Sequence, residues 1–149
     1  MLKKLILIFL LISSGCAAIG NENMNKEEII KFTDSHIEKI IKRDFQSAYQ
    51  DYYLGFRSTV SCEQFKSIFE NQLDKAYGQL KAAQFKDMSF GKRITIGKIF
   101  NIVTIFYKAG IDKPNTFIKI EVIQGKGGFA VLSYQYINFA INAVPPELK

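Results

Sequence analysis

Nucleophilic and acid–base chemistry could come from few side chains, because the chain has two cysteines and a single histidine. Cys62 and His36 are the residue types of a thiolate nucleophile and its base. Helical periodicity predicts His36 in a helix over residues 26–43 and Cys62 at the start of another over residues 62–77. A helix N-terminus favours the thiolate. No base accompanies Cys62 in sequence, so we expect a buried or inter-chain cysteine rather than a catalytic pair.

Three carboxylates are candidates for a general base: Asp51, Asp87 and Glu121. One of them would serve if it lay in an apolar cavity beside a tyrosine donor. Solvent exposure is the simpler interpretation of each, and Glu121 alternates with apolar residues, so we expect it to face water. His36 has no second histidine and no cysteine–aspartate cluster beside it, so we expect no metal site and no cofactor. We therefore name no catalytic residue and keep an enzyme as the alternative.

The first sixteen residues carry the most specific signal in the chain. Residues 1–4 form a basic head, residues 5–12 are an unbroken apolar run, and small residues precede Cys16. This arrangement is typical of a secretory signal with a cleavage site. A bilayer-spanning helix needs about 20 apolar residues, so the apolar run is too short to be one.

A cut before a cysteine resembles the lipobox of bacterial lipoproteins. The resemblance implies that residues 1–15 are removed and that Cys16 receives two or three acyl chains, which together give a stable membrane anchor. Ser13 stands where that family usually has a branched apolar residue. A secretory signal without lipidation and an uncleaved N-terminal anchor are the alternatives.

The expected location follows from the same resemblance. Ala17, not aspartate, follows Cys16, and in proteobacterial lipoproteins this favours the periplasmic side of the outer membrane, where the cell has one. We expect an extracytoplasmic protein anchored to the membrane through lipid on Cys16. The net charge of +6 falls to +4 without Lys3 and Lys4. The basic residues are scattered and form no RNA-binding signature, so we expect no nucleic-acid partner.

The rest of the chain is long enough for one domain with a single core. We expect a flexible tether over residues 16–24, one domain over residues 25–141 and a fraying tail over residues 142–149. Asn25 and Ser61 are predicted N-caps, because each has a glutamate or glutamine three residues later.

Periodicity predicts an α+β fold, with three N-terminal helices packed on a curved four-stranded antiparallel sheet. The expected helices span residues 26–43, 45–53 and 62–77, and the segment from Phe56 to Val60 is expected to be extended. The first helix should bury the side that carries Ile30, Thr33, Ile37, Ile40 and Ile41. The expected strands span residues 80–88, 93–108, 116–124 and 129–137, with a turn at Phe90-Gly91-Lys92.

This order of elements resembles the cone-shaped fold of the nuclear transport factor two-like superfamily, and in particular its small bacterial lipoproteins. The resemblance is carried by the helix pair Asn25–Tyr53, the segment Phe56–Phe65 and the β-rich run Leu80–Ile137. It implies a homodimer through the sheet. In some relatives the cone holds an isomerase or dehydratase site.

Tyr134 and Tyr136 share one face of the last predicted strand. They are candidates for a ligand site or an interface, since tyrosine is enriched at contacts, and the alternative is that they fill the core. We expect a non-catalytic binding or assembly module of the cell envelope, whose partner is an envelope protein or a second copy. The alternative is a small cone-fold enzyme, or a binder of small apolar ligands in the interior cavity.

The lipobox interpretation predicts that Cys16→Ala leaves the precursor uncleaved and unlipidated, because both steps need the thiol. Mass spectrometry of the membrane fraction and metabolic labelling with a fatty acid measure the two steps. Cys62→Ala is the matched control and should be processed normally. A cleaved, lipid-labelled Cys16→Ala product would contradict the assignment.

Overall fold

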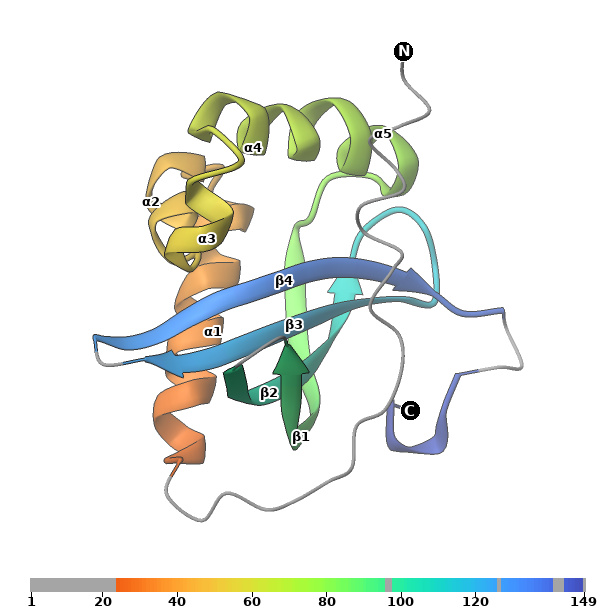
Figure 1. Cartoon of the computed structure of the whole chain (residues 1–149). Helices are drawn as coiled ribbons and strands as arrows, with labels where there is room; N and C mark the ends of the chain where they lie inside the picture. The colour runs from red at the N-terminus through yellow and green to blue at the C-terminus, as the bar shows by residue number, and fades with distance from the viewer. Residues whose placement is uncertain (1–23, 96–97, 126, 141–143, 149) are drawn as a thin grey trace.

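The computed structural model describes residues 24–95, 98–125, 127–140 and 144–148 (Figure 1). The expected signal segment and Cys16 lie outside the described residues. The helical part consists of α1 (Lys26–Ile41), α2 (Phe45–Gln50), α3 (Leu54–Arg57) and a longer helix made of α4 (Cys62–Ile68), the π-helical η3 (Phe69–Leu73) and α5 (Asp74–Tyr77). No helix in these ranges combines the length and apolar character needed to cross a membrane.

The second part of the chain forms one antiparallel sheet, in the order β1-β2-β3-β4. Its strands are β1 (Ala82–Thr95), β2 (Lys98–Gly110), β3 (Thr116–Gly125) and β4 (Gly128–Asn138), and a 3-10 turn, η4 (Pro146–Leu148), follows. The α+β class and the four-stranded antiparallel sheet are thereby confirmed.

The predicted helix caps are present. The Asn25 side chain accepts hydrogen bonds from the backbone N–H groups of Glu27 and Glu28 at the start of α1. Ser61 and Gln64 form a reciprocal capping box at the start of α4. Each cap satisfies backbone donors that the first turn of a helix leaves without a partner.

The segment predicted to be extended, from Phe56 to Val60, is instead helical and turn-like. Tyr53 is extended and α3 begins at Leu54. The hydroxyl groups of Ser58 and Thr59 both donate to the backbone carbonyl of Gly55. These local side-chain bonds favour a turn over a strand, although Thr59 and Val60 have a high strand propensity.

The turn predicted at Phe90-Gly91-Lys92 is wrong, because all three residues lie within β1. Phe90 pairs with Val103 and Lys92 with Asn101, so the hairpin continues well past Gly91. Gly91 is an ordinary strand residue paired with Ile102, and the side chains on either side of it continue to alternate between the two faces of the sheet. The irregularity in β1 is a bulge between Phe85 and Asp87, which bends the strand.

The helices cover one face of the sheet, with α1 crossing behind β3 and β4 in the view of Figure 1. Ile118, Ile120 and Val122 of β3 are fully buried on this face, as their alternation predicts. The buried residues of α1 are Ile29, Thr33, His36, Ile37 and Ile40. The buried side of α1 therefore includes Ile29 and His36 in place of the predicted Ile30 and Ile41, so the helix is rotated about its axis relative to the prediction.

The outer face of the sheet is also partly covered. Phe139, which follows β4, packs its ring on Phe117 at a centroid distance of 5.5 Å, and Leu148 of η4 is buried. Glu121 lies on this face but is only 6 % exposed, so the expectation that it faces water is wrong. Arg93, Lys119 and Ser133 surround its carboxylate. Burial raises its pKa, but these partners outweigh burial and hold the pKa below its ordinary value.

Candidate binding pocket and buried histidine–aspartate pair

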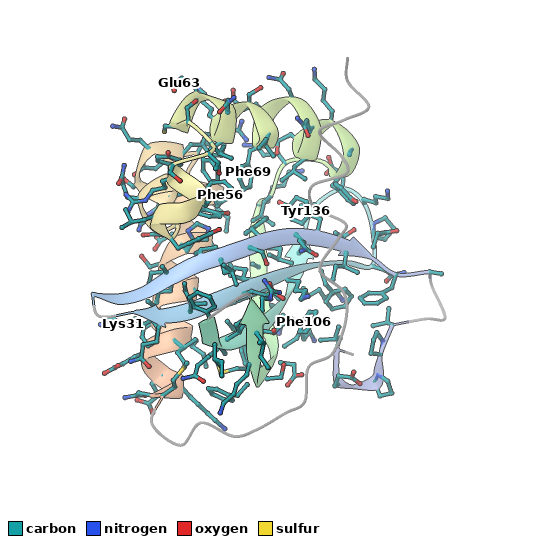
Figure 2. The ribbon with its side chains drawn as sticks, in the orientation of Figure 1. Lys31, Phe56, Glu63, Phe69, Phe106 and Tyr136 are labelled. Carbon is teal, nitrogen blue, oxygen red and sulfur yellow. The ribbon has the colours of Figure 1, made fainter. Side chains whose placement is uncertain are left out.

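A small pocket of about 50 Å³ lies between the helices and β4. We call it the aromatic pocket. Its wall is formed by Tyr52, Phe56, Phe65, Ile68, Phe69, Leu73, Leu132, Ser133 and Tyr134. Phe56, Leu73 and Leu132 are half-buried and lie toward solvent, whereas Phe65 and Phe69 are buried beneath them. Figure 2 shows Phe56 and Phe69 between the helices and β4, while Glu63 projects outward.

The aromatic side chains of the wall are packed against one another. Tyr52 stacks on Phe56 at a centroid distance of 4.5 Å and meets the edge of Phe65 at 5.1 Å. Phe69 contacts Phe65 at 5.0 Å and Tyr134 at 5.3 Å. Such pairs contribute about 0.5–1.5 kcal/mol each beyond their buried area, so the wall is held in shape without a ligand.

One side of the pocket is a π-helical turn. Phe69 and Leu73 are the first and last residues of η3, and the backbone N–H of Asp74 donates to the carbonyl of Phe69, five residues earlier. π-helical turns are rare and occur frequently at functional sites. The sequence predicts a regular helix here, since its apolar stripe gives no signal for the extra residue. Four residues of this long helix, Phe65, Ile68, Phe69 and Leu73, thus line the pocket.

Two backbone hydrogen bonds fix the opposite side. Val131 of β4 donates from its N–H to the carbonyl of Asp51 at 2.8 Å and accepts from the N–H of Tyr53 at 3.1 Å. The register between β3 and β4 shifts beside Val131, so Leu132 is an extra residue in β4. These bonds place Tyr52 in the pocket wall and Asp51 behind it.

The side chain of Asp51 connects α1 to the segment that is hydrogen-bonded to Val131 of β4. Its Oδ2 lies 2.9 Å from Nδ1 of His36, and Lys39 lies 2.7 and 2.8 Å from the two carboxylate oxygens. Burial raises the pKa of Asp51, but the hydrogen bonds from His36 and Lys39 outweigh it and keep the pKa below its ordinary value. The carboxylate is therefore ionised and can only accept, so Nδ1 of His36 carries the proton.

His36 is held neutral. Its side chain is fully buried, and burial lowers the pKa of the imidazole below its ordinary value of 6.5, although the Asp51 carboxylate opposes the shift. Since Nδ1 carries the proton, Nε2 presents a lone pair. Within the described part of the chain Nε2 is buried and has no hydrogen-bond partner.

Tyr134 brings a second unsatisfied polar atom to the same place. Its ring meets the His36 ring edge-on at a centroid distance of 6.1 Å, and its buried hydroxyl has no hydrogen-bond partner among the residues that the structure describes. Burial raises the pKa of Tyr134 well above its ordinary value, and the neighbouring Tyr136 adds to the shift. The hydroxyl is therefore protonated, and the side chain of Tyr136 is the polar group beside it.

The other candidate residues are not part of the pocket wall. Tyr136 is half-buried and packs against Tyr77 at a centroid distance of 5.2 Å. Asp87 is half-buried on β1, and Cys62 is a free, half-buried cysteine at the start of α4. In the described ranges, no three or more His, Cys, Asp or Glu side chains gather in a group that could hold a metal ion.

Sequence reasoning missed the pairing of His36 with Asp51. Ile29, Thr33, His36 and Ile40 follow one another at steps of four, three and four residues, which places His36 in the middle of a buried stripe. That spacing was the available signal. The partner could not be found this way, because Asp51 directly follows α2 and its position depends on the contact with β4.

Comparison with known proteins gives no further guide to this site, since no family model matches the chain and no similar curated protein or solved structure was found.

The buried neutral histidine predicts a loss of stability in mild acid. Below pH 6.5 His36 binds a proton in the unfolded chain, whereas in the native state it stays neutral because its pKa is lower. The free energy of unfolding should therefore fall as pH drops from 7 to 5, by up to about 1.4 kcal/mol per pH unit. His36 is the only histidine in the chain. Urea unfolding across this pH range measures the slope.

His36→Asn is the control for this slope, because its amide N–H can replace the donor to Asp51 and does not titrate. The variant should show a flatter dependence between pH 7 and 5. Equal slopes for the two proteins would contradict the assignment. The lowered pKa of Asp51 acts in the same direction but only below its ordinary value of 3.8, outside this range.

Proposed function

We propose that this protein is a lipid-anchored binding module of the cell envelope, whose aromatic pocket receives the narrow apolar end of a small ligand. The observation that carries the proposal is the pocket itself. It has an aromatic wall, a π-helical turn on one side and an unpartnered tyrosine hydroxyl. A mostly apolar wall with one well-placed polar group is the usual composition of small-molecule sites.

The size of the pocket restricts the ligand. Its volume of about 50 Å³ is below the roughly 150 Å³ of an apolar cavity that holds a benzene ring, and far below the roughly 300–1,000 Å³ of drug-sized sites. The ligand should therefore insert a short alkyl end and leave the rest outside. Leu73 and Leu132, both half-buried, lie on its path.

The Tyr134 hydroxyl adds a polar preference. A buried polar group without a partner costs about 1–3 kcal/mol, and a ligand oxygen that accepts from this hydroxyl would recover part of that. An n-alkanol or a small ketone satisfies both requirements, since it combines a short apolar chain with one oxygen.

The anchor and the family belong to the same proposal. The lipobox-like sequence at Cys16 supports a tether to a membrane outside the cytoplasm, at the periplasmic side of the outer membrane where the cell has one. The order of helices followed by a four-stranded antiparallel sheet supports the cone of the nuclear transport factor two-like superfamily. A pocket between the helices and the sheet is where that resemblance puts a ligand.

Contacts with an envelope protein or a second copy would use the outer face of the sheet, because Tyr134 and Tyr136 both face the helices. Phe106 of β2 and Ile137 of β4 are half-buried on that face. This is our proposal for the homodimer that the family resemblance implies.

Filling the pocket should abolish binding. We expect Leu132→Phe to weaken the binding of n-alkanols, from butanol to octanol, at least tenfold, because the larger ring occupies the space that the alkyl end needs. Leu54→Phe is the matched control, since Leu54 is 75 % exposed on α3. Chemical-shift titration by NMR measures both. Tyr134→Phe should weaken alkanol binding and leave the binding of n-pentane unchanged, because the alkane has no oxygen to accept from the hydroxyl. Equal affinities for all variants would contradict the proposal.

The His36–Asp51 pair favours a second candidate, an enzyme that abstracts a proton. An aspartate that fixes the Nδ1–H tautomer and leaves Nε2 as a base is a common arrangement for general-base catalysis. The Tyr134 hydroxyl could then donate to the oxygen of an enolate. His36 is not part of the pocket wall, however, so a substrate reaches Nε2 only after Tyr52 or Tyr134 moves. Binding is therefore the better-supported function.

Deuterium exchange separates the two candidates. If His36 acts as a base, butanone in D₂O should exchange its α-hydrogens faster with the protein than without it, and His36→Asn should remove the acceleration while binding persists. NMR integration of the α-hydrogens measures the rate. No acceleration by the wild-type protein would exclude this enzyme candidate and leave the binding module standing.

A further inference from the structure

The β1–β2 hairpin carries the most exposed apolar pair that the structure describes. Ile94 of β1 and Ile99 of β2 are 77 % and 67 % exposed, and they are direct cross-strand partners. Such a pair outside a core marks a contact surface when its surroundings favour one partner.

These two isoleucines continue the core-facing rows of their strands. Phe90, Lys92 and Ile94 alternate along β1, while Ile99, Asn101 and Val103 alternate along β2, and Phe90 pairs with the buried Val103. Side chains two residues apart lie on the same face of a strand. The helix-facing side of the sheet therefore extends past the helices and ends in an exposed apolar pair.

The charged residues that the hairpin itself carries near this pair are all basic. The sequence from Met88 to Ile111 has four basic residues, Lys92, Arg93, Lys98 and Lys108, and no acidic residue. Arg93 is paired with Glu121 on the outer face, whereas Lys92 is exposed in the same row as Ile94. Exposed apolar side chains among basic ones are the composition of segments that lie at the surface of an anionic bilayer.

The position in the fold favours the same partner. The Lys26 ammonium lies 5.8 Å from the centre of the Phe90 ring, so the chain enters the domain beside this hairpin. The first turn of α1 is at the end of that helix away from α2 and α4 (Figure 1). Cys16 precedes Met24 by eight residues, which span at most about 30 Å. A lipid on Cys16 would thus keep this end of the domain near the membrane.

We propose that the β1–β2 hairpin is a second membrane contact, which places Ile94 and Ile99 in the interface of an anionic bilayer. This contact depends on the proposed lipid anchor at Cys16, which keeps the hairpin close to the membrane. The two contacts together orient the domain: the hairpin end faces the lipid, and the end formed by α2, α3 and α4 faces away from it.

The absence of tryptophan from the chain permits a direct test with the full-length protein. Ile94→Trp and Ile99→Trp each add a single fluorophore at the hairpin, and Leu54→Trp adds one at an exposed site of α3. Each variant is reconstituted with vesicles of phosphatidylcholine and phosphatidylglycerol, with and without brominated acyl chains. Ile94→Trp and Ile99→Trp should emit at shorter wavelength on vesicles and be quenched by the brominated lipid, whereas Leu54→Trp should do neither.

Charge variants test the choice of an anionic surface. In the Ile94→Trp background, Lys92→Gln should reduce quenching, while Lys42→Gln, at the opposite end of α1, should not. Raising the salt from about 0.01 M to about 1 M shortens the screening length from about 30 Å to about 3 Å, so quenching should decrease. Quenching that is unchanged both by Lys92→Gln and by the rise in salt concentration would overturn the role of the anionic surface.

The remaining outcomes distinguish this inference from the anchor. Vesicle-bound protein in which Ile94→Trp stays unquenched overturns the hairpin contact and leaves the anchor intact. Emission that is already at short wavelength without vesicles shows that another part of the chain or a second copy covers the pair, and also overturns it. Protein that does not bind vesicles at all contradicts both the anchor and the hairpin contact.

Discussion

The carboxylate and backbone of Asp51 hold three parts of the domain in one arrangement. The side chain bonds His36 and Lys39 of α1, and the backbone carbonyl accepts from Val131 of β4. Because Asp51 directly follows α2, it connects the first helix, the second helix and the last strand at a single residue. Removing the carboxylate would leave the buried N–H of His36 without a partner, which typically costs about 1–3 kcal/mol. The shape of the aromatic pocket depends on this junction, since Tyr52 is the next residue.

The centre of the domain is strongly apolar, yet it contains buried polar atoms that have no hydrogen-bond partner among the described residues. Nε2 of His36 and the Tyr134 hydroxyl are both buried beside aromatic rings without a partner among the described residues. Elsewhere in the same core, the hydroxyls of Thr33 and Tyr107 bond each other at 2.7 Å. Three buried side-chain atoms of the described residues lack a partner. Two of them, in His36 and Tyr134, lie next to the pocket, and the third is Nε of Arg57 on α3. Such local departures from good packing are expected where a protein meets a ligand.

Much of the fold could be predicted from local patterns. Asn25 and Ser61 mark helix starts by cap chemistry, and Ile118, Ile120 and Val122 mark the buried face of β3 by alternation. Long-range contacts decided the rest. Glu121 alternates like a solvated residue, but Arg93 from another strand covers it. His36 and Asp51 are fifteen residues apart in sequence, and they meet because α2 packs on α1 and the backbone of Asp51 bonds to β4. The π-helical turn has no signature in an apolar stripe of ordinary spacing.

That turn also makes the long helix tolerant of a change in its length. A π-helical turn holds one more residue than the α-helical turn it replaces, so deletion of a single residue between Phe69 and Leu73 would convert the helix to a regular one. Because the wide turn already absorbs the extra residue, the residues after the deletion would keep nearly the same directions. Asp74 would still meet Arg43, which it now contacts at 2.6 Å, and Leu73 would stay in the pocket wall. A variant without the extra residue would then keep the fold and change only the width of the helix beside the pocket.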